Sequence, residues 1–155
     1  MRIGVGVVMA LALSCASSPA AAQEAEFLRQ AGIDARDLML ANLDRMMCGE
    51  VQCSPASDQE RATPPVTNDE AASIAAVAVV SAVAEHCGLD WAAGSFSPMM
   101  ASWRATAGIS DRKLALIGAT HGFVQGRAVQ AFEAQGECDE QTRAAAQSRL
   151  DQTRD

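Results

Sequence analysis

The chain has 155 residues and a formal net charge of −7, from 12 basic and 19 acidic side chains. This length fits a single domain with one hydrophobic core. The acidic balance disfavours nucleic acids and anionic membranes as partners, because both would repel the chain, and it favours a basic protein.

The first 22 residues have the order of a secretory signal peptide. Arg2 precedes an apolar run from Ile3 to Leu13, and small residues follow up to Ala22. The run is shorter than the ~20 apolar residues that span a bilayer, so this order predicts a leader that is removed after Ala22. The mature chain, residues 23–155, would then be periplasmic or secreted in a bacterium and would contain no transmembrane segment.

Cys15 offers an alternative interpretation of the same end. A lipid attached to this cysteine would make the protein an outer-membrane lipoprotein, with an assembly or pilot role. Bacterial lipoproteins usually carry Leu three positions before the modified cysteine, and here that residue is Ala12. The signal peptide is therefore the preferred prediction.

The first predicted helix runs from about Glu26 to Met47. Gly32 is expected to interrupt it, with a fresh start capped by Asp34. Residues 49–66 then form a long polar loop that ends in two prolines, and we expect this loop to be mobile. No stretch of the chain alternates apolar and polar residues for long enough to predict a strand.

The second predicted helix has a clear beginning and end. Thr67 lies three residues before Glu70, which is the spacing of a capping box, and Gly88 is suited to end the helix. Between residues 71 and 84 no side chain is charged. This pattern predicts a helix buried on most sides, at the centre of the core.

Two further helices and a tail follow. Ser97 as cap and Pro98 at the first helical position predict a short helix that ends at Gly108. The next helix is expected from Ser110 to Gly136. A tail helix, solvated or lightly docked, is expected from Asp139 to about Leu150. The inward-facing residues of the long helix are expected to be Leu114, Ile117, His121, Val124, Ala128 and Phe132.

These elements predict an all-α fold, an antiparallel bundle of four main helices plus a C-terminal tail helix, in which residues 23–155 form a single domain. The cysteines outside the leader, an even number typical of disulfides in exported proteins, are Cys48, Cys53, Cys87 and Cys138. Of the three possible pairings, alternating helix directions permit Cys48 with Cys53 at one end and Cys87 with Cys138 at the other. We therefore predict two structural disulfides.

His121 is the candidate polar site, and we expect a hydrogen-bonded core histidine there. It lies roughly 20 Å from His86 at 1.5 Å per residue, so the two cannot share an ion, and we predict no metal and no cofactor. No catalytic motif is present. The alternative is a small hydrolase that uses His121, or a thiol redox enzyme that uses Cys138 at the positive end of the tail helix.

Gly118, Gly122 and Gly126 form a ridge of glycines spaced by four within the predicted long helix. Each glycine costs a helix about 1 kcal/mol relative to alanine, so a close contact is expected to offset the cost. The alanine-rich helix at residues 71–84 is the preferred neighbour. The alternative is a groove for a partner helix, or a homodimer formed through this ridge.

The leading hypothesis is an exported, non-enzymatic helical protein that binds another envelope or secreted protein. Its role would be that of an accessory, chaperone-like or immunity-type factor. Binding would use the acidic surface, the 49–66 loop or the glycine ridge. An affinity that falls with added salt would favour the acidic surface.

Overall fold

The computed structural model describes residues 19–152, and the chain is mostly helical there. The long helices are α1 (Pro19–Ala41), α3 (Asn68–His86) and α5 (Asp111–Glu133). The shorter elements are a 3₁₀ turn (Leu43–Arg45), α2 (Asp58–Ala62), the π-helical turn η2 (Ala92–Phe96), α4 (Ser97–Arg104) and α6 (Glu140–Gln152). The prediction of a mainly helical fold is confirmed.

Within the described part of the chain, one small sheet interrupts the helices. Strands β1 (Met47–Cys48) and β2 (Val51–Gln52) form an antiparallel hairpin in which Cys48 faces Val51. Gly49 makes the turn between them with a φ of +67°, a conformation that glycine adopts without strain. The prediction that the chain contains no strand is therefore wrong, because a two-residue strand is too short to show an alternating pattern.

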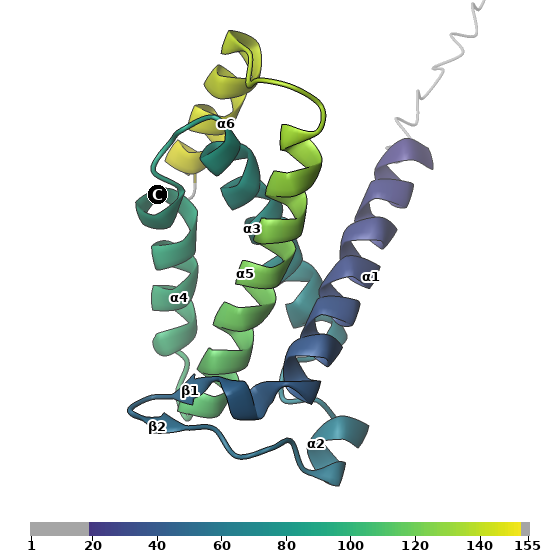
Figure 1. Cartoon of the computed structure of the whole chain (residues 1–155), viewed down its shortest axis with the longest axis vertical. Helices are drawn as coiled ribbons and strands as arrows, with labels where there is room; N and C mark the ends of the chain where they lie inside the picture. Colours follow the sequence, from purple (N-terminus) through teal and green to yellow (C-terminus); the bar gives the residue numbers. More distant parts are fainter. Residues whose placement is uncertain (1–18, 153–155) are drawn as a thin grey trace, which may run out of the picture.

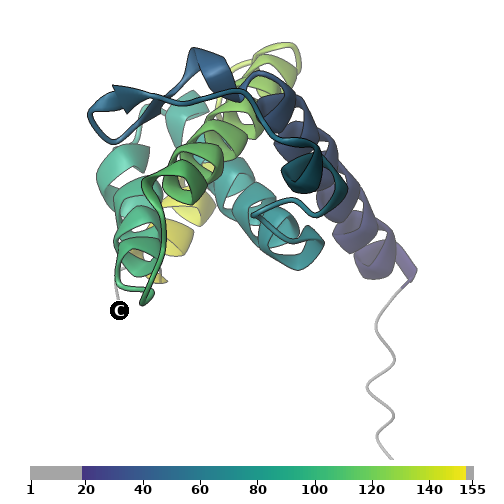
Figure 2. The same cartoon turned by 90° about the horizontal axis from the view of Figure 1, so that it is seen from below.

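Three long helices form the centre of the molecule. Helix α3 packs against both α1 and α5, and α1 also contacts α5. Helix α1 lies along one edge in both views, and α4 lies on the other side of α5 (Figures 1 and 2). Helix α4 has only eight residues, and it packs mainly against η2 and α5. The arrangement thus differs from the predicted bundle of four main helices.

The contact between α1 and α3 depends on Gly32. A Cβ atom at this position would lie 2.2 Å from the carbonyl oxygen of Ala71, so only glycine lets the two backbones approach this closely. Helix α1 continues through Gly32 without a break, which corrects the predicted interruption. It also ends at Ala41, earlier than predicted, because the chain turns there towards the β1–β2 hairpin.

The main hydrophobic core lies between these helices and the segment that joins α1 to α3. Its fully or nearly fully buried members are Leu40, Leu43, Cys53, Ala56, Val66, Ala71, Ile74, Met100, Leu116 and Ile117. Cys53, Ala56 and Val66 belong to the 49–66 segment, which is therefore packed onto the helices rather than projecting from them. Its predicted mobility stays a prediction.

Capping boxes begin both α2, which lies within this segment, and α3, which follows it. The predicted box at Thr67 and Glu70 begins α3, and a second box at Ser57 and Glu60 begins α2. Arg112 and Lys113, in the first turn of α5, form ion pairs with these two glutamates. Arg112 contacts both carboxylate oxygens of Glu60, at 2.5 and 2.9 Å, and the Nζ of Lys113 lies 2.7 Å from Glu70 Oε1. The start of α5 is thus joined to the starts of α2 and α3.

Arg112 also fixes the loop in front of α2. Its Nη1 donates to the carbonyl oxygen of Ser54 at 2.8 Å, and its Nη2 donates to the carbonyl oxygen of Pro55 at 3.1 Å. On the opposite side, Arg36 of α1 is only 4% exposed and donates to the carbonyl oxygen of Val66 at 3.0 Å. The 49–66 segment is therefore anchored by arginines from both α5 and α1.

The ends of the later helices partly agree with the predictions. Ser110 caps α5 as expected, with its side chain accepting from the backbone N–H of Lys113. Ser97 does not act as a cap, because η2 runs directly into α4 and Ser97 already has helical φ and ψ angles. The tail helix α6 is docked rather than solvated, with Ala146 and Leu150 buried.

The predicted leader lies mostly outside the described residues, and Cys15 lies wholly outside them. Residues 19–22 form the first turn of α1, so the predicted cleavage point after Ala22 falls within that helix. Among residues 19–152, no helix combines the length and the apolar character needed to cross a membrane.

Candidate functional site

The four cysteines form the two predicted pairs. The sulfur atoms of Cys48 and Cys53 lie 2.01 Å apart, and those of Cys87 and Cys138 lie 1.93 Å apart, both at disulfide distance. The first pair closes the β1–β2 hairpin, and the second joins the end of α3 to the start of α6. Cys138 therefore offers no free thiol in this structure. A disulfide is also the oxidised state of a thiol redox enzyme, so the thiol redox alternative stays a prediction.

His121 lies at a crossing of three elements. Its ring is 1% exposed, and its Nε2 atom lies 2.9 Å from the hydroxyl oxygen of Ser81 on α3. That hydroxyl lies 2.7 Å from the hydroxyl of Ser95 on η2. The ring of Phe96 packs 4.9 Å from the imidazole, centroid to centroid, and Trp91 stacks 6.3 Å from it. The predicted hydrogen-bonded core histidine is therefore present, with two serine hydroxyls added.

A count of protons assigns the tautomer of His121. Ser81 also lies 3.1 Å from the carbonyl oxygen of Val77, and Ser95 lies 2.8 Å from that of Trp91. Four contacts therefore compete for two hydroxyl protons, since each serine supplies only one. A proton on Nε2 supplies a third, donated to Ser81. We therefore assign the neutral ring with its proton on Nε2, which satisfies the most contacts.

Burial lowers the pKa of His121 from 6.5 to about 4, so the ring is neutral at pH 7. A serine hydroxyl next to a histidine nitrogen is the arrangement of an activated nucleophile. Ser81 and Ser95 are only 0% and 1% exposed, however, so a substrate cannot reach either hydroxyl. The geometry therefore favours a structural role for this cluster over the hydrolase alternative.

The glycine ridge does not make the predicted contact within the chain. Apart from its chain neighbours and the adjacent backbone of α5 itself, a Cβ atom added at Gly118, Gly122 or Gly126 would meet no heavy atom of the described residues within 4 Å. The expectation that the alanine-rich α3 packs on this ridge is therefore wrong. The buried residues of α5 are instead Leu116, Ile117, Thr120, His121, Val124 and Gln125. Phe123, next to the ridge, is 36% exposed.

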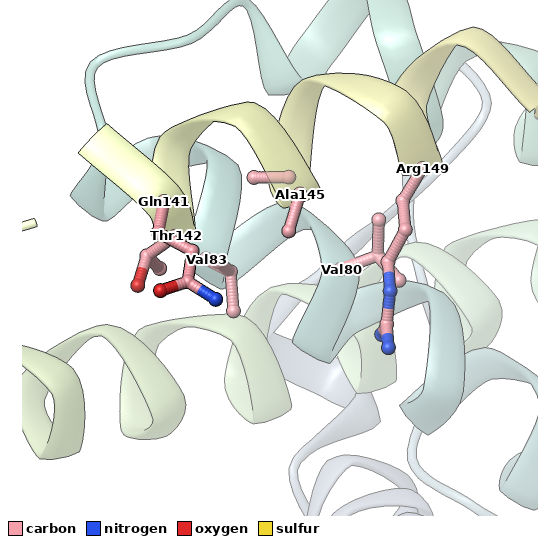
Figure 3. A pocket seen from close by; sticks show the side chains of 7 residues that line it. Val80, Val83, Gln141, Thr142, Ala145 and Arg149 are labelled. Atoms are coloured by element: carbon pink, nitrogen blue, oxygen red, sulfur yellow. The ribbon is translucent and has the colours of Figure 1, made fainter. Parts of the chain in front are cut away.

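A shallow groove of about 330 Å³ lies between α3 and α6 (Figure 3). Val80 and Val83 of α3 and Ala145 of α6 give it an apolar floor, and Arg149 is its one charged lining residue. Within residues 19–152, no group of three or more His, Cys, Asp or Glu side chains is placed to hold a metal ion.

The sequence analysis missed both the capping box at Ser57 and the contacts of Ser81 with His121 and Ser95. The capping box at Ser57 has the same Ser/Thr-x-x-Glu spacing that identifies the box at Thr67, so the sequence does contain that signal. Ser81 carries a hydroxyl within an apolar helix, and only the fold brings it next to His121 and Ser95.

Comparison of the chain with protein-family models, with curated proteins and with solved structures finds no match.

Proposed function

We propose that this chain is an exported, non-enzymatic helical protein that binds another envelope or secreted protein through the α5 glycine face. This face comprises Gly118, Gly122, Gly126 and the adjacent Phe123. The observation that carries the proposal is the open space above the three glycines, where an added Cβ would touch nothing within 4 Å.

The fold of the chain itself gives no reason for glycine at these positions. None of the three has a positive φ, so the backbone conformation is available to alanine. Alanine there would stabilise α5 by about 0.8–1.0 kcal/mol per position. A ridge without side chains lets a second helix approach closely, and Phe123 supplies an exposed apolar anchor beside it. The contact with a partner helix would thus offset the helix stability that the three glycines forfeit relative to alanine.

The remaining parts of the proposal rest on separate observations. Two cysteine pairs at disulfide distance support an oxidising compartment, periplasmic or extracellular. The burial of His121 supports a role without catalysis. Of the three predicted binding regions, the 49–66 segment is occupied by contacts with the helices, which favours the glycine face. Lipidation at Cys15 stays a separate prediction.

Site-specific cross-linking in intact cells tests the proposal. A photoreactive amino acid replaces Phe123 in one strain and Ser73, an exposed residue of α3, in a control strain. We expect one dominant cross-linked protein from position 123 and none from position 73. A product of twice the mass of the chain would instead identify a homodimer through this face. Equal products from both positions, or no product from either, would refute binding at the α5 glycine face.

A second measurement separates binding from folding. The double substitution of alanine for Gly122 and Gly126 is expected to stabilise the fold and to reduce recovery of the cross-linked partner, because each added methyl group holds the partner helix away. Ala76→Leu places a larger apolar side chain on an exposed position of α3 and serves as the control. Partner recovery is expected to change little with salt, since the contact is apolar. Loss at high salt would favour the acidic surface instead.

A further inference from the structure

The cluster around His121 is the main polar connection between η2 and the helices beneath it. Among the residues of η2, only Ser95 has a side chain that can form a hydrogen bond, and its hydroxyl contacts Ser81 on α3 at 2.7 Å. Ser81 in turn contacts His121 on α5 at 2.9 Å. These side-chain hydrogen bonds therefore run from Ser95 of η2 to Ser81 of α3, and from Ser81 to the neutral imidazole of His121 on α5.

Among residues 19–152, no acidic side chain contacts this imidazole, so a charge on the ring would have no counter-ion beside it. On α3, Glu70 is paired with Lys113, and Glu85, four residues after Ser81, accepts a hydrogen bond from the neutral amide of Gln125. Asp69 lies beside Arg29 of α1, and His86 packs against Phe132. Before η2, Asp90 accepts from the backbone N–H of Ala93, and η2 itself has no titratable residue. The other charged residues on the elements around the cluster are Asp111, Arg112, Arg127 and Glu133 on α5, Arg104 on α4, and Glu140, Arg143, Arg149 and Asp151 on α6, which packs against η2 and α3.

We infer that His121 is the proton sensor of an acid-triggered opening of the η2–α4 segment, residues 92–104. Protonation would put a full positive charge among two hydroxyls and the rings of Phe96 and Trp91, without a carboxylate in contact. A buried charge without a partner is relieved by admitting water. The η2–α4 segment is the part that yields, since α3 and α5 are held to each other and to α1.

The direction of the effect follows from the pKa of the histidine in the two states. Burial holds the pKa of His121 at about 4 in the closed state, and an opened, hydrated ring returns to 6.5. Closure is therefore fully stabilised above pH 6.5 and is progressively lost as the pH falls from 6.5 towards 4. The equilibrium constant for opening is expected to rise about 30-fold between pH 7.5 and pH 5. This inference is independent of the partner proposed above.

Hydrogen exchange on the disulfide-bonded protein provides the test. After correction for the intrinsic pH dependence of exchange, amides of residues 92–104 are expected to open about 30-fold more at pH 5 than at pH 7.5. Amides of α1 serve as the internal control. His121→Phe keeps a ring that cannot be protonated and is expected to abolish the increase, whereas His86→Phe, which removes the other histidine, is expected to leave it unchanged.

The fluorescence of Trp91, measured with Trp103 replaced by phenylalanine, gives a second readout because Trp91 stacks on His121. A transition with its midpoint between pH 4 and 6.5 is expected, and it should be absent once His121 is replaced. If His121→Phe does not fold at pH 7.5, His121→Gln takes its place. An exchange rate in the wild-type segment that is independent of pH, or the same transition without His121, overturns the inference.

Discussion

Replacing single glycines by alanine is expected to have opposite effects on the stability of α1 and α5. Gly32 and Gly122 both lie within long helices, and both would gain the same helix propensity from a methyl group. They differ in what that methyl group meets. We therefore predict that Gly122→Ala raises the free energy of unfolding and that Gly32→Ala lowers it.

The magnitudes follow from the space around each residue. The Cβ of an alanine at position 122 would meet no described heavy atom within 4 Å, so the full propensity gain of about 1 kcal/mol is expected. At position 32 the same atom would lie 2.2 Å from the carbonyl oxygen of Ala71, and 2.6 Å from its carbon. These are backbone atoms that cannot rotate away, so α1 and α3 must separate. Overpacking of this kind costs about 1–3 kcal/mol, which exceeds the propensity gain.

Urea unfolding followed by circular dichroism measures both changes. The midpoint is expected to rise for Gly122→Ala and to fall for Gly32→Ala, with an unchanged dependence on urea concentration. The measurement is made at two protein concentrations, because a homodimer through the glycine face would make the Gly122 result depend on concentration. A neutral Gly32→Ala would refute the close approach of α1 to α3. A destabilising Gly122→Ala at low concentration would show that α5 needs this glycine for its own fold.

Two further predictions concern acid and disulfides. Hydrogen bonding to Arg112 lowers the pKa of Glu60 to about 2. The stability that this carboxylate contributes is therefore present above pH 4.5 and is lost as the pH falls towards 2. Glu60→Gln should remove this part of the acid sensitivity in thermal unfolding curves recorded from pH 5 to pH 2, and an unchanged curve would contradict the role given to the ion pair. The two disulfides close loops of different length, with sequence separations of 51 for Cys87–Cys138 and 5 for Cys48–Cys53. Loop-closure entropy predicts losses of about 4 and about 2 kcal/mol on replacing each pair by serine, and urea unfolding that gives the reverse order would exclude this account.

Capping residues in the sequence predict correctly where α3 and α5 begin. Thr67 and Glu70 begin α3 as expected, and Ser110 begins α5, because a cap acts on backbone N–H groups a few residues away. The disulfide pairs also follow from the sequence, since alternating helix directions bring only certain ends together. The β1–β2 hairpin does not, because strands of two residues carry too little pattern to be recognised.

The contacts between helices are the part that sequence patterns predict poorly. The same residue type, glycine within a helix, is a point of close approach at position 32 and an open position at 122. Helix propensity assigns both glycines the same destabilisation of their helix. Only the positions of the neighbouring backbones distinguish them. The contact between Ser81 and His121 could not be predicted for a similar reason, because the two residues are 40 positions apart in the chain and adjacent only in the fold.

Helices α1 and α3 approach each other closely at Gly32, which bears directly on the α5 glycine face. Gly32 and the buried Ala71 already give α3 a small-residue contact on the side of α1. Helix α5 contacts α3 through larger side chains instead, including Ile117 and the hydrogen-bonded His121. The glycines of α5 are therefore not needed to bring α3 closer, and they face away from it. Their destabilising effect on an isolated chain, about 3 kcal/mol for three positions, is the cost that the proposed partner helix would offset.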